Sequence, residues 1–280
     1  MLKNRRILIT GAAGSIGSEI VRQLCKKNKV LGVDYNETGI WDLKEELDIE
    51  VIVGDIRDEK VLEEAFEFKP HYVFHAAALK HVTPLEIRPK DAVDTNIYPT
   101  LNLIRLCQLR NAKFVYVSTD KAVNPSCIMG ASKLFGEVAT INAGFNIVRF
   151  GNVMNSRGSV IPIWQRQINQ GRPLTVTDDR MERFMMTIEE AAELIIKAAE
   201  IKKWWDETTG RWMGNKLILD MGKPIRVIDM AKRFLEEARL NLGIKITGAR
   251  PGEKLTERLM NEDERERAKP KGKFFVIAKI

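Results

Sequence analysis

The feature that most limits the possible fold is a regular alternation of short β-branched runs with amphipathic helical segments. Six strand candidates lie at Arg5–Thr10, Lys29–Asp34, Glu50–Val53, His71–His75, Lys113–Ser118 and Phe145–Phe150. Apolar residues recur at helical spacings of three and four in the segments Ser15–Lys27, Glu59–Phe68, Lys90–Arg110 and Met129–Ile141. Strands that alternate with helices form parallel βαβ units. The sequence therefore predicts an α/β fold with a doubly wound parallel sheet.

A glycine triplet follows the first predicted strand directly and opens the first predicted helix. Gly11, Gly14 and Gly17 allow a tight turn, close approach of the backbone to a pyrophosphate, and close packing of helix on strand. The phosphates would lie against the positive end of the helix dipole, next to Ser15 and Ile16. An ordinary strand-to-helix turn is the alternative, but the βαβ context favours a Rossmann-type dinucleotide site.

The second predicted strand ends in a carboxylate. Asp34 stands 17 positions after Gly17, where its oxygens can accept hydrogen bonds from the adenosine ribose hydroxyls. A 2'-phosphate would be repelled there and no Arg follows immediately, so the sequence favours NAD over NADP. Asp55 and Ile56 lie just past the third strand, where an adenine ring would be flanked, although a solvated turn acid is an equally good interpretation of Asp55.

The pattern becomes less regular after about residue 151. Further helix and strand candidates lie at Ile161–Gln170, Leu174–Thr177, Ile188–Lys202, Lys216–Leu219 and Ile225–Leu240. We expect residues 1–150 to form the NAD-binding Rossmann domain, with elements around 185–222 returning to it. Residues 151–184 and 223–280 are expected to form a smaller C-terminal substrate-binding lobe.

Composition limits the class of partner. The net charge of +7 suits nucleic acid, an anionic membrane surface or a phosphorylated small molecule. No basic helix is interleaved with aromatic residues, and the acidic run at 262–267 would repel phosphate, so we expect no nucleic acid. No run of 18 uncharged apolar residues is present, and we expect a cytoplasmic protein without membrane insertion.

The metal-ligating residue types are sparse and poorly spaced. The three cysteines are far apart and form no CxxC motif, which indicates a reducing compartment and no structural zinc. His71 and His75 are four residues apart but lie on a predicted strand, where this spacing does not bring two ligands together as it does on a helix. The sequence therefore predicts no metal site.

Several short blocks together resemble a known family. The glycine spacing, the Thr-Asp pair after the fifth strand and Lys133 resemble the extended short-chain dehydrogenase/reductase superfamily. AAALKHV at 76–82, STDKAVNP at 118–125, MGASK at 129–133, RFGNV at 149–153, SRGSVIP at 156–162 and RPGEKL at 250–255 are similar to the UDP-N-acetylglucosamine 4,6-dehydratase family of polysaccharide biosynthesis. The matched blocks cover most of the chain.

The resemblance implies catalytic roles for residues that follow the fifth strand. Asp120 would be the general acid and Lys121 the general base, which requires a protonated Asp and a neutral Lys, the reverse of their ordinary states near neutral pH. Lys133 would bond the nicotinamide ribose. Met129 stands where the superfamily has its catalytic Tyr, and a thioether cannot accept the proton of the C4 hydroxyl. Asp120, Lys133 or a water relayed through Thr119 are candidates for that step.

The resemblance also implies positions that contact the ligands. Cofactor contacts are expected in addition at Ala76, Ala77, Lys80, Asn96 and Ser118. Substrate contacts are expected at Lys80, His81, Asn152, Ser159, Val160, Arg183, Arg250 and Glu253. An Arg suits a pyrophosphate because its guanidinium donates two parallel hydrogen bonds. Glu253 would accept from the uridine ribose.

Three functions remain open at the level of sequence. The resemblance implies a nucleotide-sugar 4,6-dehydratase that converts UDP-N-acetylglucosamine into a 4-keto-6-deoxy product, and a homo-oligomer. A nucleotide-sugar epimerase of the same fold is the alternative, although such an enzyme normally relies on the missing Tyr. A catalytically silent NAD-binding sensor is the third, and Met129 is its main support.

Overall fold

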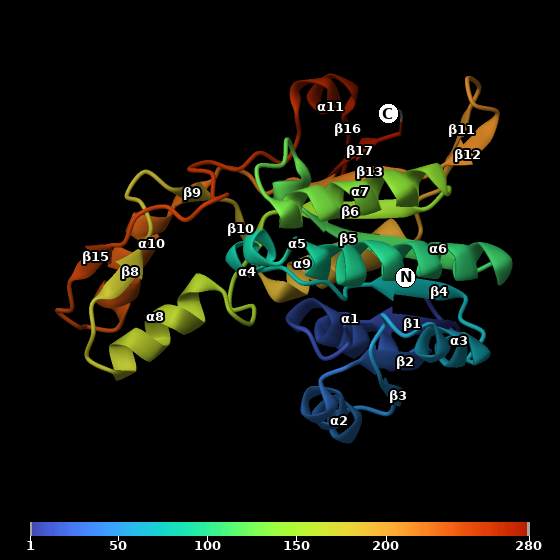
Figure 1. Ribbon diagram of the computed structural model, residues 1–280, viewed down its shortest axis with the longest axis horizontal. Coiled ribbons are helices and arrows are strands. Elements are labelled where there is room, and N and C mark those ends of the chain that lie inside the picture. Colours follow the sequence, from blue (N-terminus) through green and yellow to red (C-terminus); the bar gives the residue numbers. More distant parts are fainter. Residues whose placement is uncertain (1, 279–280) are drawn as a thin grey trace.

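A nine-stranded sheet forms the centre of the computed structural model, which describes residues 2–278 (Figure 1). The strand order is β16-β17-β13-β6-β5-β4-β1-β2-β3, and all strands from β13 to β3 run parallel. The parallel strands are β1 (Arg6–Thr10), β2 (Lys29–Asp34), β3 (Glu50–Val53), β4 (Tyr72–His75), β5 (Lys113–Thr119), β6 (Asn146–Phe150) and β13 (Lys216–Leu219). The predicted doubly wound α/β fold is confirmed.

Helices cover both faces of this sheet (Figure 1). One face carries α1 (Ser15–Cys25), α2 (Glu37–Glu46) and α9 (Ile188–Ala198), and the other carries α3 (Glu59–Glu67), α6 (Tyr98–Leu109) and α7 (Ile128–Asn142). Side chains of a strand alternate between faces, so Ile7 and Ile9 pack toward α1 and α9 while Leu8 packs toward α3 and α6. No helix within residues 2–278 has both the length and the apolar character needed to span a membrane.

The segment predicted as one helix over Lys90–Arg110 is divided in the structure. It consists of α5 (Pro89–Ala92), a π-helical turn at Val93–Ile97 and α6. Pro99 lies in the first turn of α6 and has no backbone N–H, so the regular hydrogen-bond ladder cannot run through this point. Three helices were not identified from the sequence, α2, the short α4 (Val82–Ile87) and the short α11 (Glu262–Arg267), because each buries only one or two residues.

A smaller lobe lies beside the sheet, at the left of Figure 1. It contains α8 (Val160–Asn169), β8 (Leu174–Val176), β9 (Glu182–Arg183), β14 (Ile225–Arg226), α10 (Val227–Glu237) and β15 (Ile244–Ile246). Its core is built around Trp164, which is fully buried and donates its indole N–H to the Thr175 carbonyl over 2.9 Å. The lobe therefore has a hydrophobic cluster of its own, separate from those of the sheet.

The C-terminal residues depart from the predicted division of the chain. Part of the segment 223–280, which was assigned to the lobe, extends the main sheet through β16 (Lys269–Lys271) and β17 (Phe274–Ile277). β17 pairs antiparallel with β13, because its buried Phe274 and Ile277 cover an apolar edge that β13 would otherwise leave open. The remaining short strands are β7 (Asn152–Val153), β10 (Met185–Met186), β11 (Trp204–Asp206) and β12 (Arg211–Met213).

A buried ion-pair network fastens this C-terminal region to α7. Arg149 of β6 binds Glu137 of α7 over 2.5 Å and Glu264 of α11 (Glu262–Arg267) over 2.7 Å. Lys216 of β13 lies 3.3 Å from Glu137 and also pairs with Glu264. The four side chains carry two positive and two negative charges, so the network is neutral as a whole.

Candidate active site

The glycine turn has the geometry of a phosphate cradle. Gly11 has φ +72°, and a Cβ there would lie 2.6 Å from the backbone nitrogen of Ala77. A Cβ on Gly17 would lie 2.0 Å from the carbonyl oxygen of Gly11, so neither position accepts a side chain. α1 begins after Gly14 without a side-chain cap, which leaves its first N–H groups to a ligand. Other residues predicted for this site lie around the turn, at Ile16 in α1, Ile56 after β3 and Ala76 after β4.

The two acidic residues predicted for the cofactor site, Asp34 and Asp55, have different hydrogen-bond partners. Asp34 accepts hydrogen bonds from the backbone N–H of Ala13 over 3.0 Å and of Asn36 over 2.9 Å, which fixes its carboxylate beside the glycine turn. Asp55 is paired with the Arg57 guanidinium over 2.5 Å, and this hydrogen-bonded ion pair lowers the pKa of Asp55. Asp34 is therefore the carboxylate placed next to the cradle.

Two further predicted cofactor residues make their hydrogen bonds inside the protein. The Asn96 amide accepts from the Leu79 N–H over 2.8 Å and donates to the Leu79 carbonyl and the Ser132 hydroxyl, each over 3.0 Å. Ser118 donates to Glu137 over 2.6 Å. Asn96 therefore holds the loop after β4 against the start of α7. Ser118 holds β5 against α7.

The predicted acid and base lie together at the carboxyl end of β5. A 3₁₀ turn over Asp120–Ala122 brings the two adjacent side chains together. The Lys121 ammonium donates to Asp120 Oδ1 over 3.0 Å, and the Thr119 hydroxyl donates to the same oxygen over 2.9 Å. Asp120 is fully buried, and its Oδ2 has no hydrogen-bond partner. One carboxylate oxygen is thus held by the protein while the other is free to contact a ligand.

A third ionisable side chain, which the sequence analysis did not identify, completes this cluster. Glu257 is buried, and its Oε1 lies 3.7 Å from the Lys121 ammonium. Burial would lower the pKa of Lys121, but the negative charges of Asp120 and Glu257 outweigh burial and raise it. Burial raises the pKa of Glu257. The one signal in the sequence is a second acid four positions after Glu253 in the same loop.

The helix α7 carries the other two predicted catalytic residues. Met129 is buried in a small apolar cluster with Leu85 and Cys127. Lys133 follows one turn later, and its ammonium lies 4.2 Å from the centre of the Tyr116 ring. Burial lowers the pKa of Lys133 to about 7, although the negative charge of Glu137 opposes this shift. A large fraction of Lys133 is therefore neutral at neutral pH.

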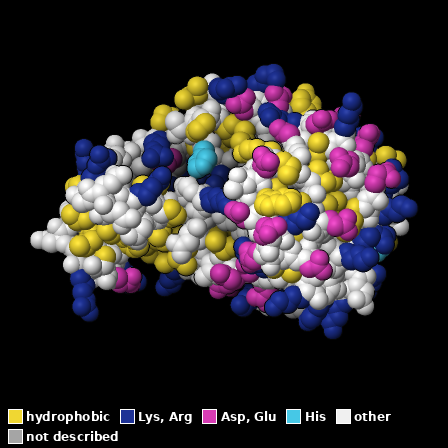
Figure 2. All heavy atoms as spheres, turned by 90° about the horizontal axis from the view of Figure 1, so that it is seen from below, with side chains coloured by type: hydrophobic (Ala, Val, Ile, Leu, Met, Phe, Trp, Pro, Cys, Tyr) yellow, Lys and Arg dark blue, Asp and Glu magenta, His cyan; other side chains and the backbone are white. Residues whose placement is uncertain are grey.

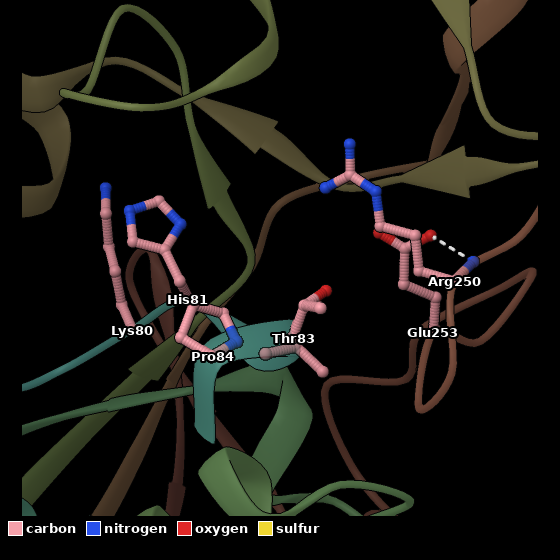
Figure 3. A pocket seen from close by; sticks show the side chains of 7 residues that line it. Lys80, His81, Thr83, Pro84, Arg250 and Glu253 are labelled. Atoms are coloured by element: carbon pink, nitrogen blue, oxygen red, sulfur yellow. Dashed lines mark hydrogen bonds between the residues drawn. The ribbon is translucent and has the colours of Figure 1, made fainter. Parts of the chain in front are cut away.

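Four predicted substrate residues line one pocket of about 360 Å³ (Figure 3). Lys80 and His81 stand on one side, and Arg250 and Glu253 stand on the other. Glu253 accepts the backbone N–H of Arg250 over 3.1 Å, the dashed line in Figure 3, which closes the loop on itself. Burial and the charges of Lys80 and Arg250 lower the pKa of His81. Lys80 and Arg250 place basic side chains on opposite walls, which makes the pocket suited to an anion.

A loop connects this pocket to the glycine turn. The Lys80 ammonium donates to the Arg157 carbonyl over 2.6 Å, and the Arg157 N–H donates to the Ser15 hydroxyl over 3.0 Å. Gly158 in the same loop has φ +72°, and a Cβ there would lie 2.8 Å from the His81 ring. The same loop therefore contacts both the cofactor cradle and the pocket.

The last predicted substrate residues lie where the lobe meets the sheet. Arg183 is buried and donates to the carbonyls of residues 254–255 over 2.9 and 3.0 Å, so it holds that segment in place rather than facing the pocket. Asn152 is in β7, and Ser159 directly precedes Val160, the first residue of α8. Asn152 Oδ1 and Ser159 Oγ are buried without a hydrogen-bond partner.

Unsatisfied polar atoms are concentrated at this site. Of the six such buried atoms found in residues 2–278, four belong to Asp120, Asn152, Ser159 and Glu257. Buried polar atoms nearly always have partners, so this concentration indicates that a ligand supplies them. Figure 2 shows Lys and Arg side chains on both sides of the hollow between the lobe and the sheet. The described residues contain no group of three or more His, Cys, Asp or Glu arranged to hold a metal ion.

Comparison with known sequences gives a consistent set of relatives. The sequence model of a family described as "Polysaccharide biosynthesis protein" matches residues 7–279. The capsular polysaccharide biosynthesis protein CapD of Staphylococcus aureus is 40% identical over 94% of this chain, and the match spans 46% of CapD. A UDP-N-acetylglucosamine 4,6-dehydratase (inverting) of Campylobacter jejuni is 31% identical, covering 94% of this chain and 80% of the relative. A UDP-glucose 4-epimerase of Rickettsia bellii is also 31% identical, covering 99% and 84%.

Solved structures share the whole architecture. Pen from Bacillus thuringiensis superposes with a TM-score of 0.90 at 36% identity, covering 98% of this chain and 88% of Pen. DesIV from Streptomyces venezuelae, a dTDP-glucose 4,6-dehydratase with NAD and TYD bound, has a TM-score of 0.76 at 21% identity and covers 93% and 90%. The second likeness is one of fold alone.

Proposed function

Because the chain belongs to the polysaccharide biosynthesis protein family of extended short-chain dehydrogenases/reductases, an enzyme family of nucleotide-sugar dehydratases and epimerases, we propose that it is a UDP-N-acetylglucosamine 4,6-dehydratase. The product would be a UDP-4-keto-6-deoxy-N-acetylhexosamine. The observation that carries this choice is the buried Asp120–Lys121 pair with one free carboxylate oxygen. Loss of water needs a base at C5 and an acid at the C6 hydroxyl, whereas epimerisation moves a proton only at the C4 hydroxyl. Met129 in place of the Tyr on which epimerases rely supports the same choice.

The cradle around Gly11 and Gly17 fits the pyrophosphate of NAD, because a Cβ at either position would fill the space against the backbone. Asp34 supports NAD over NADP, since its fixed carboxylate accepts from ribose hydroxyls and repels a 2'-phosphate. Bound NAD would supply the redox chemistry by taking a hydride from C4 of the sugar and returning it to C6. Lys133, Ser15 and the free N–H groups of α1 would hold and orient it.

The residues of the pair would move the protons of the elimination. Transfer of one proton along the 3.0 Å hydrogen bond from Lys121 Nζ to Asp120 Oδ1 produces a neutral base and a protonated acid together. Lys121 then removes the C5 proton, which the C4 ketone has acidified. Asp120 donates its proton to the C6 hydroxyl as the C6–O bond breaks, and water leaves. C5 finally regains a proton, on the face that decides between retention and inversion.

The proton of the C4 hydroxyl needs a separate acceptor. We assign it to Lys133, because burial lowers the pKa of this side chain to about 7 while Asp120 must keep a proton for the leaving group. Passing that proton on to Asp120 after water leaves would restore the starting state, so the cycle is balanced. The thioether of Met129 would be a bystander that fills the space of the absent phenol.

The cationic pocket would bind the nucleotide part of the substrate. Lys80, His81 and Arg250 would face the diphosphate, and Glu253 would accept from the uridine ribose. We also propose a homo-oligomer, which the exposed apolar side chains of Tyr98 on α6 and Phe135 on α7 support.

The test is to incubate the purified protein with UDP-N-acetylglucosamine and NAD and to measure the mass of the product. Loss of one water supports the dehydratase. An unchanged mass with an altered sugar would indicate an epimerase, and unaltered substrate would indicate an NAD-binding protein without this activity. Either of the last two outcomes refutes the proposal.

A further inference from the structure

We propose that Glu257 is a positioning residue for the catalytic pair, whose buried carboxylate holds the Lys121 ammonium against Asp120 and keeps a proton on the pair at alkaline pH. The inference rests on the proposed function, in which the pair must carry that proton to release water. None of the proposed catalytic steps uses Glu257, and this residue lies far from Asp120 and Lys121 in the sequence.

The segment that carries Glu257 is fixed to the catalytic turn by several contacts. The Lys254 ammonium donates to the carbonyls of Val123 over 2.8 Å and of Asn124 over 2.7 Å, directly after the 3₁₀ turn. Arg183 holds the carbonyls of residues 254–255 from the other side. This buried guanidinium and the paired ammonium leave the Glu257 carboxylate little freedom to move away from its place 3.7 Å from Lys121.

The position of Glu257 determines what it can do. Its Oε1 lies 3.7 Å from the Lys121 ammonium, while its Oε2 has no hydrogen-bond partner and lies 3.9 Å from the Lys254 ammonium. A carboxylate in a buried place without hydrogen bonds is costly unless a cation compensates it. Lys121 is therefore within ion-pairing distance of two buried acids, and its charge compensates both.

The charges around the pair give the direction of the effect. The negative charges of Asp120 and Glu257 favour the charged form of Lys121, and the positive charge of Arg183 opposes it. The positive charge of Lys254 favours the ionised form of Glu257. The pair can eliminate water only while one proton is present to protonate the leaving hydroxyl. A negative charge at Glu257 opposes loss of that proton as the pH rises, so it extends activity toward alkaline pH.

The size of the effect follows from the separation. Two unit charges 3.7 Å apart, at an effective dielectric constant of about 20, correspond to at most about three pKa units. Arg183, Lys254 and the partial exposure of Lys121 reduce this value. We expect Glu257→Gln to lower the pKa of Lys121, and the alkaline limb of the rate profile with it, by about one unit or more.

The experiment titrates Lys121 directly. Full-length protein labelled with ¹³C at the lysine Cε is followed by NMR from pH 7 to 12, and the Lys121 signal is identified by its loss in Lys121→Met. Wild type, Glu257→Gln and Glu257→Asp are compared, with Glu266→Gln as a control that removes an exposed acid of α11. The pH dependence of kcat for water loss is measured on the same proteins, and thermal unfolding shows that each is folded.

The expected order of the Lys121 pKa is wild type and Glu266→Gln highest, Glu257→Asp next and Glu257→Gln lowest. An unchanged Lys121 pKa in Glu257→Gln overturns the inference. If the Gln variant does not fold, Glu257→Asp decides, because its carboxylate is one methylene farther from Lys121 and must lower the pKa. The titration needs no turnover, so it tests Glu257 even if UDP-N-acetylglucosamine is not dehydrated, and product mass tests the reaction independently.

Discussion

Removing one charge from the buried network predicts a pH-dependent loss of stability. Glu264 is buried between Arg149 and Lys216, and these partners outweigh burial to lower its pKa from 4.5 to about 2. Because each pKa unit corresponds to 1.36 kcal/mol, lowering the pKa of Glu264 by about 2.5 adds about 3 kcal/mol to the free energy of unfolding at neutral pH. Breaking a buried ion pair from one side typically costs about 3–5 kcal/mol. We expect Glu264→Gln to destabilise the protein by about 3 kcal/mol at pH 7.

The pH dependence follows from the sign of the shift. Because the pKa of Glu264 is lower in the folded state, its contribution is complete above the unfolded value of 4.5 and is lost as the pH falls through about 2. The difference between variant and wild type should therefore shrink to about half by pH 3. Urea unfolding followed by tryptophan fluorescence at pH 7 and pH 3 measures it.

The control for this measurement is on the same short helix. Glu266→Gln removes an exposed charge from α11 and should change the free energy of unfolding by less than about 0.5 kcal/mol. If Glu264→Gln were equally mild at pH 7, or if its cost did not depend on pH, the network would not have the energetic role derived from its geometry.

Three further predictions concern the site itself. Asp120→Asn and Lys121→Ala should each lower kcat for water loss by about 10²–10⁴-fold while leaving NAD binding intact, as measured by product mass and calorimetry. Gly17→Ala should abolish NAD binding in calorimetry, because its Cβ would lie 2.0 Å from the Gly11 carbonyl oxygen, and binding of wild-type strength would contradict the cradle. Lys133→Met should raise the melting temperature, and the gain should be larger at pH 6 than at pH 9. The pKa of Lys133 falls from 10.5 to about 7 on folding, because burial disfavours the charged ammonium. The charged side chain therefore destabilises the folded state fully below pH 7, and this effect fades as the pH rises toward 10.5. A gain independent of pH would contradict this.

The parts of the fold that were predictable depend on local patterns. The strand candidates match β1 to β6 and β13. β-branched runs favour strands, and glycines favour the turns that end them, and both effects depend only on residues close in sequence. Asp120 and Lys121, which we propose as the catalytic pair, lie directly after β5 as expected, since the strand and the turn are adjacent in sequence. The structure also brings Lys80 and His81 to the same pocket as Arg250 and Glu253. The sequence alone did not indicate how close these two segments lie in space.

The parts that were not predictable depend on contacts between distant segments. Lys254 and Val123 are 131 positions apart, so the position of Glu257 four residues after Glu253 does not by itself indicate that it lies near Lys121. The acidic run of α11 suggested a surface that repels phosphate, yet one of its acids, Glu264, is buried against Arg149. β17 could not be placed either, because it joins the parallel strands through β13, which is distant from it in the sequence.

The docking of residues 254–257 onto the catalytic turn has a consequence for biosynthesis. Lys121 leaves the ribosome 136 residues before Glu257, an interval of roughly 7–27 seconds at about 5–20 residues per second. During this interval the first six strands can pair while the nascent lysine still lacks its second acid. The order of translation therefore delays assembly of the complete site until residues 254–257 have been made.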